Sequence, residues 1–204
     1  KLQVARKAAS ASSTARWPSA GPAEVFESGD QYWSWVDDMV ATGVVMDKGM
    51  VYTDARLSAS YPTVEFRVAD VCLDVGDTVL VAALCRALVD TATSQRATEE
   101  PPQRVPTSMV RLATWQAARA GLDGDLLDPA SFRPRPAREV VDSLLRHLRP
   151  ALSANGDLPA VEQRVRLLFE AGNGASQQRA VLAKTGRMAD VVAHLARVTA
   201  GQHG

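Results

Sequence analysis

Apolar and polar side chains alternate strictly along the segment "YPTVEFRVAD". A period of two is the pattern of a β-strand, because successive side chains of a strand point to opposite faces. Val64, Phe66 and Val68 would then share one face of the strand. Glu65 and Arg67 would stand side by side on the other face. The pattern predicts a half-buried strand with one apolar and one charged face.

The segment "MVYTDARLS" alternates in the same way and is separated from that strand by Ala59 and Ser60 alone. Two alternating segments with a short link predict a β-hairpin or two neighbouring strands. Two strands do not make an independently stable sheet. We therefore expect further strands in this sheet, either upstream in a longer parent chain or on a partner chain.

Helical patterns account for most of the remaining chain. Ser28 is a favourable N-cap for a helix over residues 29–42, which stops at Gly43. Asp74 or Asp77 caps a long helix, "TVLVAALCRALVDTA", which is apolar almost all round. A helix of that composition is expected to be central to the core.

Five shorter helices follow, and two polar loops, "SQRATEEPPQRVP" and "LDGDLLDPASFRPRP", interrupt the series. The helices are "TSMVRLATWQAARAGL", one beginning near Pro136, one opened by Asp157, "ASQQRAVLAK" and a final one. Apolar stripes at helical spacing mark three of them: Val140, Val141, Leu144, Leu145 and Leu148; Val161, Val165 and Leu168; and Met188, Val191, Val192 and Leu195. These stripes predict core contacts.

Strands near residues 49–70 followed by helices over 74–204 predict an α+β fold. Residues 1–23 are expected to be coil, because prolines and a glycine interrupt "RWPSAGPAE". The basic, serine-rich opening suits a transit peptide, a flexible linker or the cut edge of a longer chain. We favour the cut edge, so residues 1–23 form a flexible or truncated segment ahead of residues 24–204.

Composition narrows the function classes. The 204 residues include 23 Lys+Arg and 23 Asp+Glu, so there is no global basic field to attract nucleic acid. No window approaches the roughly 20 apolar residues of a membrane span. Cys72 and Cys85 lie in apolar surroundings, which predicts buried thiols without a disulfide and a cytoplasmic location. Neither nucleic acid nor a membrane is expected as a partner.

The charged face of the "YPTVEFRVAD" strand is the first candidate site. Glu65 could bind Mg²⁺ through carboxylate oxygens, and Arg67 could bind phosphate oxygens with its planar fork of donors. The simpler alternative is a cross-strand ion pair on a solvated face. Asp54 and Arg56 repeat the same spacing on the preceding strand, and such a density of charge on one sheet face favours a site.

Two further features have a functional and a structural interpretation. Trp115 and Arg119 lie four residues apart on a helix, which suits either a stack of the guanidinium on the indole or a substrate-binding arginine. Gly172 and Gly174 precede a helix and could seat an anion. A helix stop followed by a new helix start explains the two glycines equally well, because the segment lacks the lysine and hydroxyl of a P-loop.

Several motifs occur in the order that they have in a known family. They are "RWPSAGP", "TDARLSASYPTVEFRVADVCLDV", "WQAARAGLDGDLLDP" and "GNGASQQRA". On these motifs the chain closely resembles the C-terminal half of the bacterial carboxylate–amine ligases of the glutamate–cysteine ligase type 2 family. The resemblance runs from about Arg16 to the last helix.

The resemblance implies a partial glutamine-synthetase-like antiparallel sheet wrapped by a mostly helical C-terminal region. Residues 24–204 would then be the C-terminal part of the ligase catalytic domain. It also implies formation of an amide bond of the γ-glutamyl type, dependent on ATP and Mg²⁺, between a glutamate-like carboxylate and an amine. The carboxylate is activated as an acyl phosphate, which the amine then attacks.

By position, Glu65 matches the metal-binding glutamate of the family. Arg67 matches the catalytic arginine that steadies the transferred phosphoryl group. Asp54 and Arg56 match the "D-x-R" strand, and Arg119 matches the arginine of the "W-x-A-x-R-x-G-L" element. The resemblance implies substrate-binding roles for these three residues.

The chain departs from the family pattern in two ways. Thr53 and Leu57 stand in the "W-D-x-R-P" motif where the family commonly has Trp and Pro, so we expect a different substrate pocket. The early acidic metal ligands and the His-containing strand of the family have no counterpart here. We therefore expect activity to need an N-terminal half or a partner subunit. The alternative is a non-catalytic interaction module that retains the ligase fold, and a homo-oligomer stays open.

Overall fold

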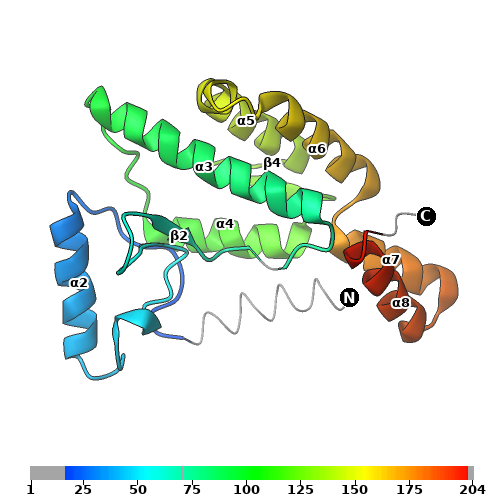
Figure 1. Ribbon diagram of the computed structural model, residues 1–204, viewed down its shortest axis with the longest axis horizontal. Coiled ribbons are helices and arrows are strands. Elements are labelled where there is room, and N and C mark those ends of the chain that lie inside the picture. Colours follow the sequence, from blue (N-terminus) through cyan, green and yellow to red (C-terminus); the bar gives the residue numbers. More distant parts are fainter. Residues whose placement is uncertain (1–16, 70, 202–204) are drawn as a thin grey trace.

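A computed structural model describes residues 17–69 and 71–201 (Figure 1). Most of the coil predicted for residues 1–23 lies outside the described residues, and residues 17–23 contain no helix or named strand. Helices and two small antiparallel sheets make up the rest, so the predicted α+β fold is confirmed. None of the described helices is long and apolar enough to cross a membrane.

The first helix of the described residues, α2 (Gly29–Ala41), begins where the sequence predicts it. Ser28 adopts an extended backbone, and its hydroxyl accepts a hydrogen bond from the backbone N–H of Gln31 at 3.1 Å. Tyr32 and Val36 of this helix are buried in a small core of their own. That core also includes Val45, Val51 and several aromatic side chains around the short helix η1 (Lys48–Met50).

The predicted hairpin forms from β1 (Ala55–Leu57) and β2 (Val64–Phe66), which pair antiparallel. Its faces are not buried as the alternation predicts, however. Val64 and Phe66 are each 39% exposed, and Val68 is exposed as well. Among the described residues no third strand extends this two-stranded sheet, and its apolar side is left partly uncovered.

The main core lies between three long helices, α3 (Val75–Ala97), α5 (Ala137–Ala154) and α6 (Leu158–Ala171). The predicted stripes of α5 and α6 face this core, where Leu148 and Leu152 are fully buried. Asp74 is the N-cap of α3, and its carboxylate accepts a hydrogen bond from the N–H of Gly76 at 2.6 Å.

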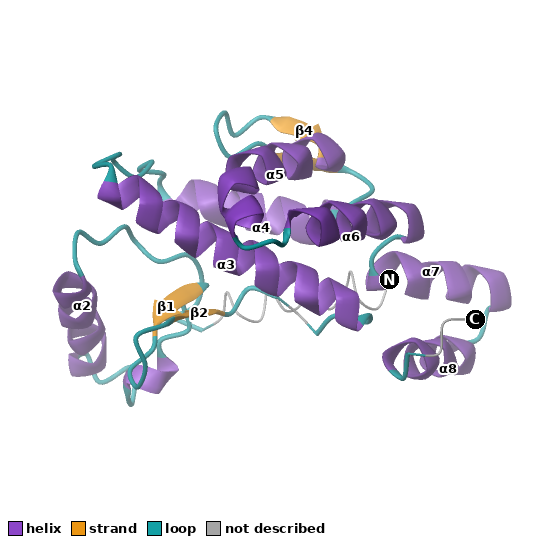
Figure 2. Cartoon of the chain, turned by 45° about the horizontal axis from the view of Figure 1, so that its top comes forward, coloured by secondary structure: helices purple, strands orange, loops and turns teal. Residues whose placement is uncertain are grey.

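Helix α3 differs from its prediction in two respects. It continues into the first residues of the predicted loop and ends only at Ala97. It contributes the buried Leu80 and Ala87 to the main core, as predicted, but α5 and α6 cover only one side of it (Figure 2). Val75 and Val79 are 78% and 62% exposed, so the apolar side chains on the other sides of α3 face outward.

Helix α4 (Thr107–Ala120) is followed by a second hairpin, β3 (Asp125–Leu127) and β4 (Pro134–Pro136), in a segment that the sequence predicts to be a loop. That prediction is wrong for a physical reason. The carboxylate of Asp128 accepts hydrogen bonds from the N–H groups of Ala130 and Ser131 and from the guanidinium of Arg135. These bonds close the turn, so a proline-rich segment can pair as a short edge strand.

Helices α7 (Gly174–Thr185) and α8 (Met188–Thr199) form an antiparallel pair at one end of the molecule (Figure 1). Gly186 ends α7 in a left-handed conformation, which glycine adopts without strain. The stripe predicted for α8 is only partly buried. Val191 is covered, whereas Met188 and Val192 are 43% and 62% exposed.

Candidate functional site

The first hairpin brings Arg56 and Glu65 directly opposite each other across the β1–β2 pair. Nε of Arg56 donates to Oε2 of Glu65 at 2.7 Å. The same guanidinium donates through its NH1 to the backbone carbonyls of Gly49 and Val51, each at 3.1 Å. Arg56 therefore ties the hairpin to the turn at η1, and it holds the carboxylate of Glu65 in place.

Arg67 lies beside this pair but is less engaged. Its NH1 is 4.0 Å from Oε2 of Glu65, and its guanidinium lies over the ring of Tyr52, 5.2 Å from the centroid. The Arg67 side chain is 41% exposed, compared with 16% for Arg56. Most donors of Arg67 are thus open to a ligand, whereas those of Arg56 are largely used within the protein.

Asp54 is fixed next to the hairpin by its backbone. Its N–H donates to the carbonyl of Gly21, and its carbonyl accepts from the N–H of Arg67, both at 2.8 Å. Burial raises the pKa of the Asp54 carboxyl, and the positive charge of Arg111 opposes that shift. Asp54 therefore belongs to the same region as Glu65 and Arg67, although in the described part of the chain no side-chain hydrogen bond or ion pair joins it to them.

Arg111 of α4 was not among the residues that the sequence singled out. It reaches this region from a distant part of the chain and lies against Gly21, where an added Cβ would come within 3.5 Å of its Nε. Gly21 has φ +116°, a conformation that other residues rarely adopt. The pattern of apolar residues does not predict this contact, because the contact depends on how α4 packs beside the hairpin.

Arg119, on the same helix, makes the contact that the structural interpretation predicts. Its guanidinium lies over the ring of Trp115, 4.6 Å from the centroid, and both side chains are exposed. In the described part of the chain, no hydrogen bond or ion pair joins Arg119 to the hairpin. The structure therefore brings Glu65, Arg67, Arg56 and Asp54 together and leaves Arg119 on the surface of α4.

Two of the motifs quoted above meet in space. In the "GNGASQQR" segment, Asn173 caps α7 by accepting from the N–H of Ser176 at 3.0 Å, which is the helix stop and restart that the glycines suggested. The Ser176 hydroxyl and the Arg179 guanidinium bond to Asp123 of the "GLDG" segment at 3.1 and 3.2 Å. These contacts anchor α7 beside the end of α4.

Glu65 is the residue that the sequence analysis predicts as a metal ligand. Across residues 17–69 and 71–201, no three His, Cys, Asp or Glu side chains gather as a metal-binding group. Oε2 of Glu65 is taken by Arg56, whereas Oε1 accepts no hydrogen bond from a described residue. The hairpin can therefore offer one carboxylate oxygen to a metal ion.

Comparison with known proteins identifies relatives over nearly the whole chain. The model of the family described as "Glutamate-cysteine ligase family 2" matches residues 11–195. A protein of Streptomyces coelicolor named "Putative glutamate--cysteine ligase 2" is 55% identical over 185 residues, which are 90% of this chain and 51% of that protein. A similarly named protein of Streptomyces avermitilis is 50% identical over 186 residues, covering 91% and 51% of the two chains.

A third relative, a protein of Paenarthrobacter aurescens named "Putative glutamate--cysteine ligase 2-3", is 48% identical over 164 residues. Those residues make up 80% of this chain and 39% of that protein. The chain thus spans about half the length of the curated relatives that it matches.

Proposed function

This chain belongs to the glutamate–cysteine ligase family 2, and on that premise we propose that it carries part of the site of an ATP- and Mg²⁺-dependent carboxylate–amine ligase. In the proposed reaction, a glutamate-like carboxylate oxygen attacks the γ-phosphorus of ATP and ADP leaves. The amine nitrogen then attacks the acyl phosphate carbonyl, loses a proton and expels phosphate. A cytoplasmic location is part of the proposal, because neither Cys72 nor Cys85 forms a disulfide.

The observation that carries the proposal is the uneven use of the charged groups on the hairpin. The guanidinium of Arg56 donates hydrogen bonds to Glu65, Gly49 and Val51. By contrast, the guanidinium of Arg67 and Oε1 of Glu65 remain available to a ligand. A cluster that served stability alone would gain nothing from leaving these groups uncommitted. The open groups lie at the same edge of the sheet.

Glu65 fits a magnesium ligand. Mg²⁺ usually binds proteins through one or two carboxylates and keeps waters and substrate phosphates in its remaining positions. Oε1 of Glu65 would supply one such oxygen, and Arg56 would hold the carboxylate so that Oε1 faces outward. When bound, the metal neutralises charge on the phosphates that react.

Arg67 is assigned the catalytic role of contacting the transferred phosphoryl group. Its exposed guanidinium can donate two parallel hydrogen bonds to phosphate oxygens, and stacking on Tyr52 limits its orientations. A cation at that place stabilises charge that spreads over the equatorial oxygens during transfer.

Substrate binding is assigned to Asp54, Arg56 and Arg119, with different support for each. Asp54 lies at the hairpin and could receive the substrate amine. Arg56 acts mainly by positioning Glu65. Arg119 would need a substrate that extends along α4, because its present contact is Trp115.

Thr53, which stands where the family commonly has Trp, is buried, and its hydroxyl donates to the carbonyl of Ala55. The side chain at this position therefore stabilises the start of β1.

The proposal includes residues from outside this chain. One carboxylate oxygen at an exposed two-stranded sheet is too little to hold a metal, a nucleotide and two substrates. The curated relatives are about twice as long, which leaves room for the other ligands in the part that the chain does not match. The competing hypothesis is a non-catalytic module that has kept the ligase fold.

A chimeric enzyme tests the function. The part of the Streptomyces coelicolor relative that this chain does not match would be joined to this chain, and ADP release would be followed with glutamate and a panel of amines. We expect release that needs ATP, Mg²⁺ and both substrates. Glu65→Gln should raise the Mg²⁺ concentration for half-maximal rate about tenfold or more, because the neutral amide is a poor ligand for a hard cation.

Arg166→Gln is the matched control for charge removal, since Arg166 is an exposed residue of α6 and lies outside the hairpin. A chimera without ATP-dependent turnover would favour the non-catalytic module. An active chimera in which Glu65→Gln leaves the Mg²⁺ dependence unchanged would overturn the assignment of Glu65.

A further inference from the structure

The proposed reaction activates one carboxylate of a glutamate-like substrate and leaves the other unchanged. The second carboxylate keeps its charge when the substrate binds, and a charged group is costly to bury unless it is paired. A cation must therefore hold it. Glu65 and Arg67 are already assigned to the metal and to the phosphoryl group, so this cation is a further residue of the site.

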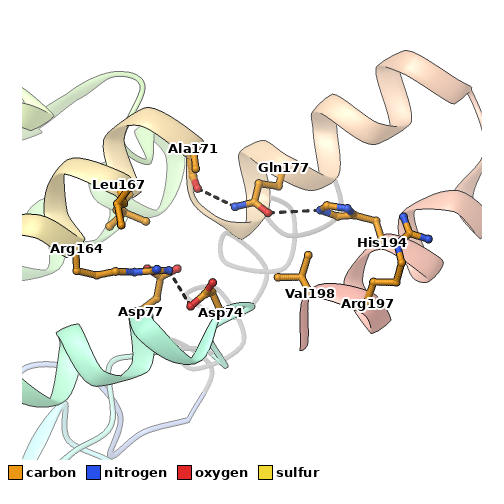
Figure 3. A pocket seen from close by; sticks show the side chains of 11 residues that line it. Asp74, Asp77, Arg164, Leu167, Ala171, Gln177, His194, Arg197 and Val198 are labelled. Atoms are coloured by element: carbon orange, nitrogen blue, oxygen red, sulfur yellow. Dashed lines mark hydrogen bonds and ion pairs between the residues drawn. The ribbon is translucent and has the colours of Figure 1, made fainter. Parts of the chain in front are cut away.

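The arginines that line the cavity between α3, α6 and the α7–α8 pair are not candidates. They are Arg164 and Arg197, and no residue of β1 or β2 lines that cavity. Figure 3 shows Arg164 turned toward the start of α3, where its NH2 pairs with Asp74 at 2.9 Å and with Asp77 at 2.8 Å. Arg164 is thus used within the protein, in a cavity to which the hairpin does not contribute.

Arg111 of α4 is an open cation beside the hairpin. Its Nε and NH2 lie 3.5 and 3.6 Å from the position that a Cβ on Gly21 would take. Because Gly21 has no side chain, that space is left to the guanidinium. Arg111 is exposed and, within residues 17–69 and 71–201, makes no hydrogen bond or ion pair, so its five N–H donors are available to a ligand.

Backbone hydrogen bonds place Gly21 next to the charged strands. The N–H of Asp54 donates to the carbonyl of Gly21, and the N–H of Arg67 donates to the carbonyl of Asp54, both at 2.8 Å. Gly21 also forms a parallel bridge with Thr53. Three segments therefore run side by side, in the order Gly21, Asp54 and Arg67. Neighbouring paired strands lie about 4.8 Å apart, so the backbone at Gly21 is about 10 Å from that at Arg67.

The length of glutamate is comparable with this separation. Four C–C bonds of about 1.5 Å join its two carboxyl carbons, which are about 5 Å apart when the chain is extended. One charge-assisted contact of about 2.8 Å at each end brings the total to about 11 Å. A glutamate that is held at Arg111 by one carboxylate would therefore present the other one to the part of the hairpin where Arg67 is open.

The charge of Arg111 acts on the same region. Burial raises the pKa of the Asp54 carboxyl, and the positive charge of Arg111 opposes that shift. The two side chains are therefore neighbours, because water and salt screen the interaction of charges that are more than about 10 Å apart. They do not form an ion pair with each other in the described part of the chain, so no direct partner neutralises the guanidinium.

Arg119, the arginine of α4 to which the family resemblance gives a substrate-binding role, is placed differently. It lies eight residues beyond Arg111, which is about 12 Å along the helix axis at about 1.5 Å per residue. Its guanidinium lies over the ring of Trp115, 4.6 Å from the centroid. Of these two arginines, Arg111 is the one that lies at the hairpin.

We propose that Arg111 binds the carboxylate of the substrate that does not react, and that it thereby selects a dicarboxylate such as glutamate. The assignment rests on the proposed ligase function, which places the reacting carboxylate near Arg67. Arg111 holds a group whose charge is the same before and during the reaction. It should therefore contribute to substrate binding and leave the rate of the chemical step nearly unchanged.

The chimeric enzyme described above tests the assignment with two substrates, L-glutamate and L-isoglutamine, in which an amide replaces the α-carboxylate. In the parent chimera we expect KM to be about tenfold or more higher for isoglutamine, because one charge-assisted contact is missing. Arg111→Gln should raise KM for glutamate by a similar factor and KM for isoglutamine by less than about threefold, so the preference for glutamate is lost. The kcat for glutamate should change by less than about threefold, as expected when binding to substrate and transition state is lost equally.

Three variants separate substrate binding from other effects. Arg111→Lys keeps the positive charge and should keep a preference for glutamate. Arg119→Gln should keep it as well, because Arg119 lies away from the hairpin. Arg166→Gln removes an exposed arginine of α6 and should leave both KM values unchanged. Arg111→Gln should shift the melting temperature of the 204-residue chain by less than about 2 °C, since Arg111 makes no hydrogen bond or ion pair with a described residue.

The possible failures can be told apart. A chimera without ATP-dependent turnover would overturn the proposed function and this assignment with it. An active chimera in which Arg111→Gln keeps the full preference for glutamate would overturn the assignment of Arg111 alone. The same holds if Arg111→Gln lowers the melting temperature and weakens both substrates equally, because that result indicates a structural role.

Discussion

The helical core and the first hairpin use their apolar residues in opposite ways. Leu148 and Leu152 are fully buried between α3, α5 and α6. On the hairpin, Val64 and Phe66 are each 39% exposed, although their pattern in the sequence is just as regular. The core completes its own packing, whereas the hairpin leaves an apolar face and a charged edge available to other groups.

If the proposed function holds, this difference separates stability from chemistry along the chain. Substitutions in the core should change the free energy of unfolding, because neighbouring side chains cannot fill the space that is lost. Substitutions at the open groups of the hairpin should change function and leave stability nearly constant. The predictions below test where that division holds.

The largest effect is expected for Leu152→Ala. Removing a fully buried leucine side chain typically costs about 2–5 kcal/mol of unfolding free energy, from lost transfer energy and the cavity left behind. Urea unfolding followed by circular dichroism measures the change. Leu112→Ala on α4 is the control, since Leu112 is 55% exposed and should change stability by less than about 0.5 kcal/mol. Equal losses in the two variants would mean that the helical core is not packed as described.

A smaller effect is expected within the hairpin for Arg56→Ala. Three hydrogen bonds to Glu65, Gly49 and Val51 are lost, and we expect about 1–3 kcal/mol less stability. Arg67→Ala, two residues past Glu65, should change stability by less than about 0.5 kcal/mol, because Arg67 is exposed and its ion pair is long. If Arg67→Ala destabilised the chain as much as Arg56→Ala, the contrast between the two arginines would be wrong.

The smallest effects concern pH. Hydrogen bonds from Ser131 lower the pKa of the Asp128 carboxyl, so its contribution to stability is present above its unfolded pKa and is lost as the pH falls through the folded value. Burial raises the pKa of Asp54, so its contribution has the opposite sign and is lost as the pH rises. Melting temperatures between about pH 3 and 7 separate the two.

Asp128→Asn should reduce the loss of stability on acidification. Asp54→Asn should raise the melting temperature near neutral pH and have little effect at the acidic end, where the parent carboxyl is already protonated. A melting curve in which both variants shift in the same direction at every pH would contradict the opposite causes assigned to the two carboxyls.

Much of the fold could be predicted because the deciding contacts are local or periodic. The cap at Ser28, the stripe that includes Leu148 on α5 and the stripe that includes Val165 on α6 each depend on spacing within a single helix. The second hairpin was missed because Pro134 and Pro136 indicate a break in regular structure, whereas its stability comes from the bonds that Asp128 makes. The spacing of apolar residues along the sequence does not predict hydrogen bonds of this kind.

The candidate site was predictable in part for the same reason. Alternation places Glu65 and Arg56 on one face of a hairpin, and the register pairs them. It does not show that Arg56 also binds the carbonyl groups before the strand, nor that Arg111 reaches Asp54 from α4. The alternating pattern also did not predict that Phe66 is exposed, because burial depends on which elements cover the sheet.

The most direct test of the central claim is to measure turnover and stability together for Arg67→Ala in the chimeric enzyme. If the hairpin provides chemistry rather than stability, kcat for ADP release should fall by about 10²–10³, the usual cost of losing a group that stabilises transition-state charge. The free energy of unfolding should match that of the parent within about 0.5 kcal/mol. An unchanged kcat, or a fall that follows a matching loss of stability, would contradict the account.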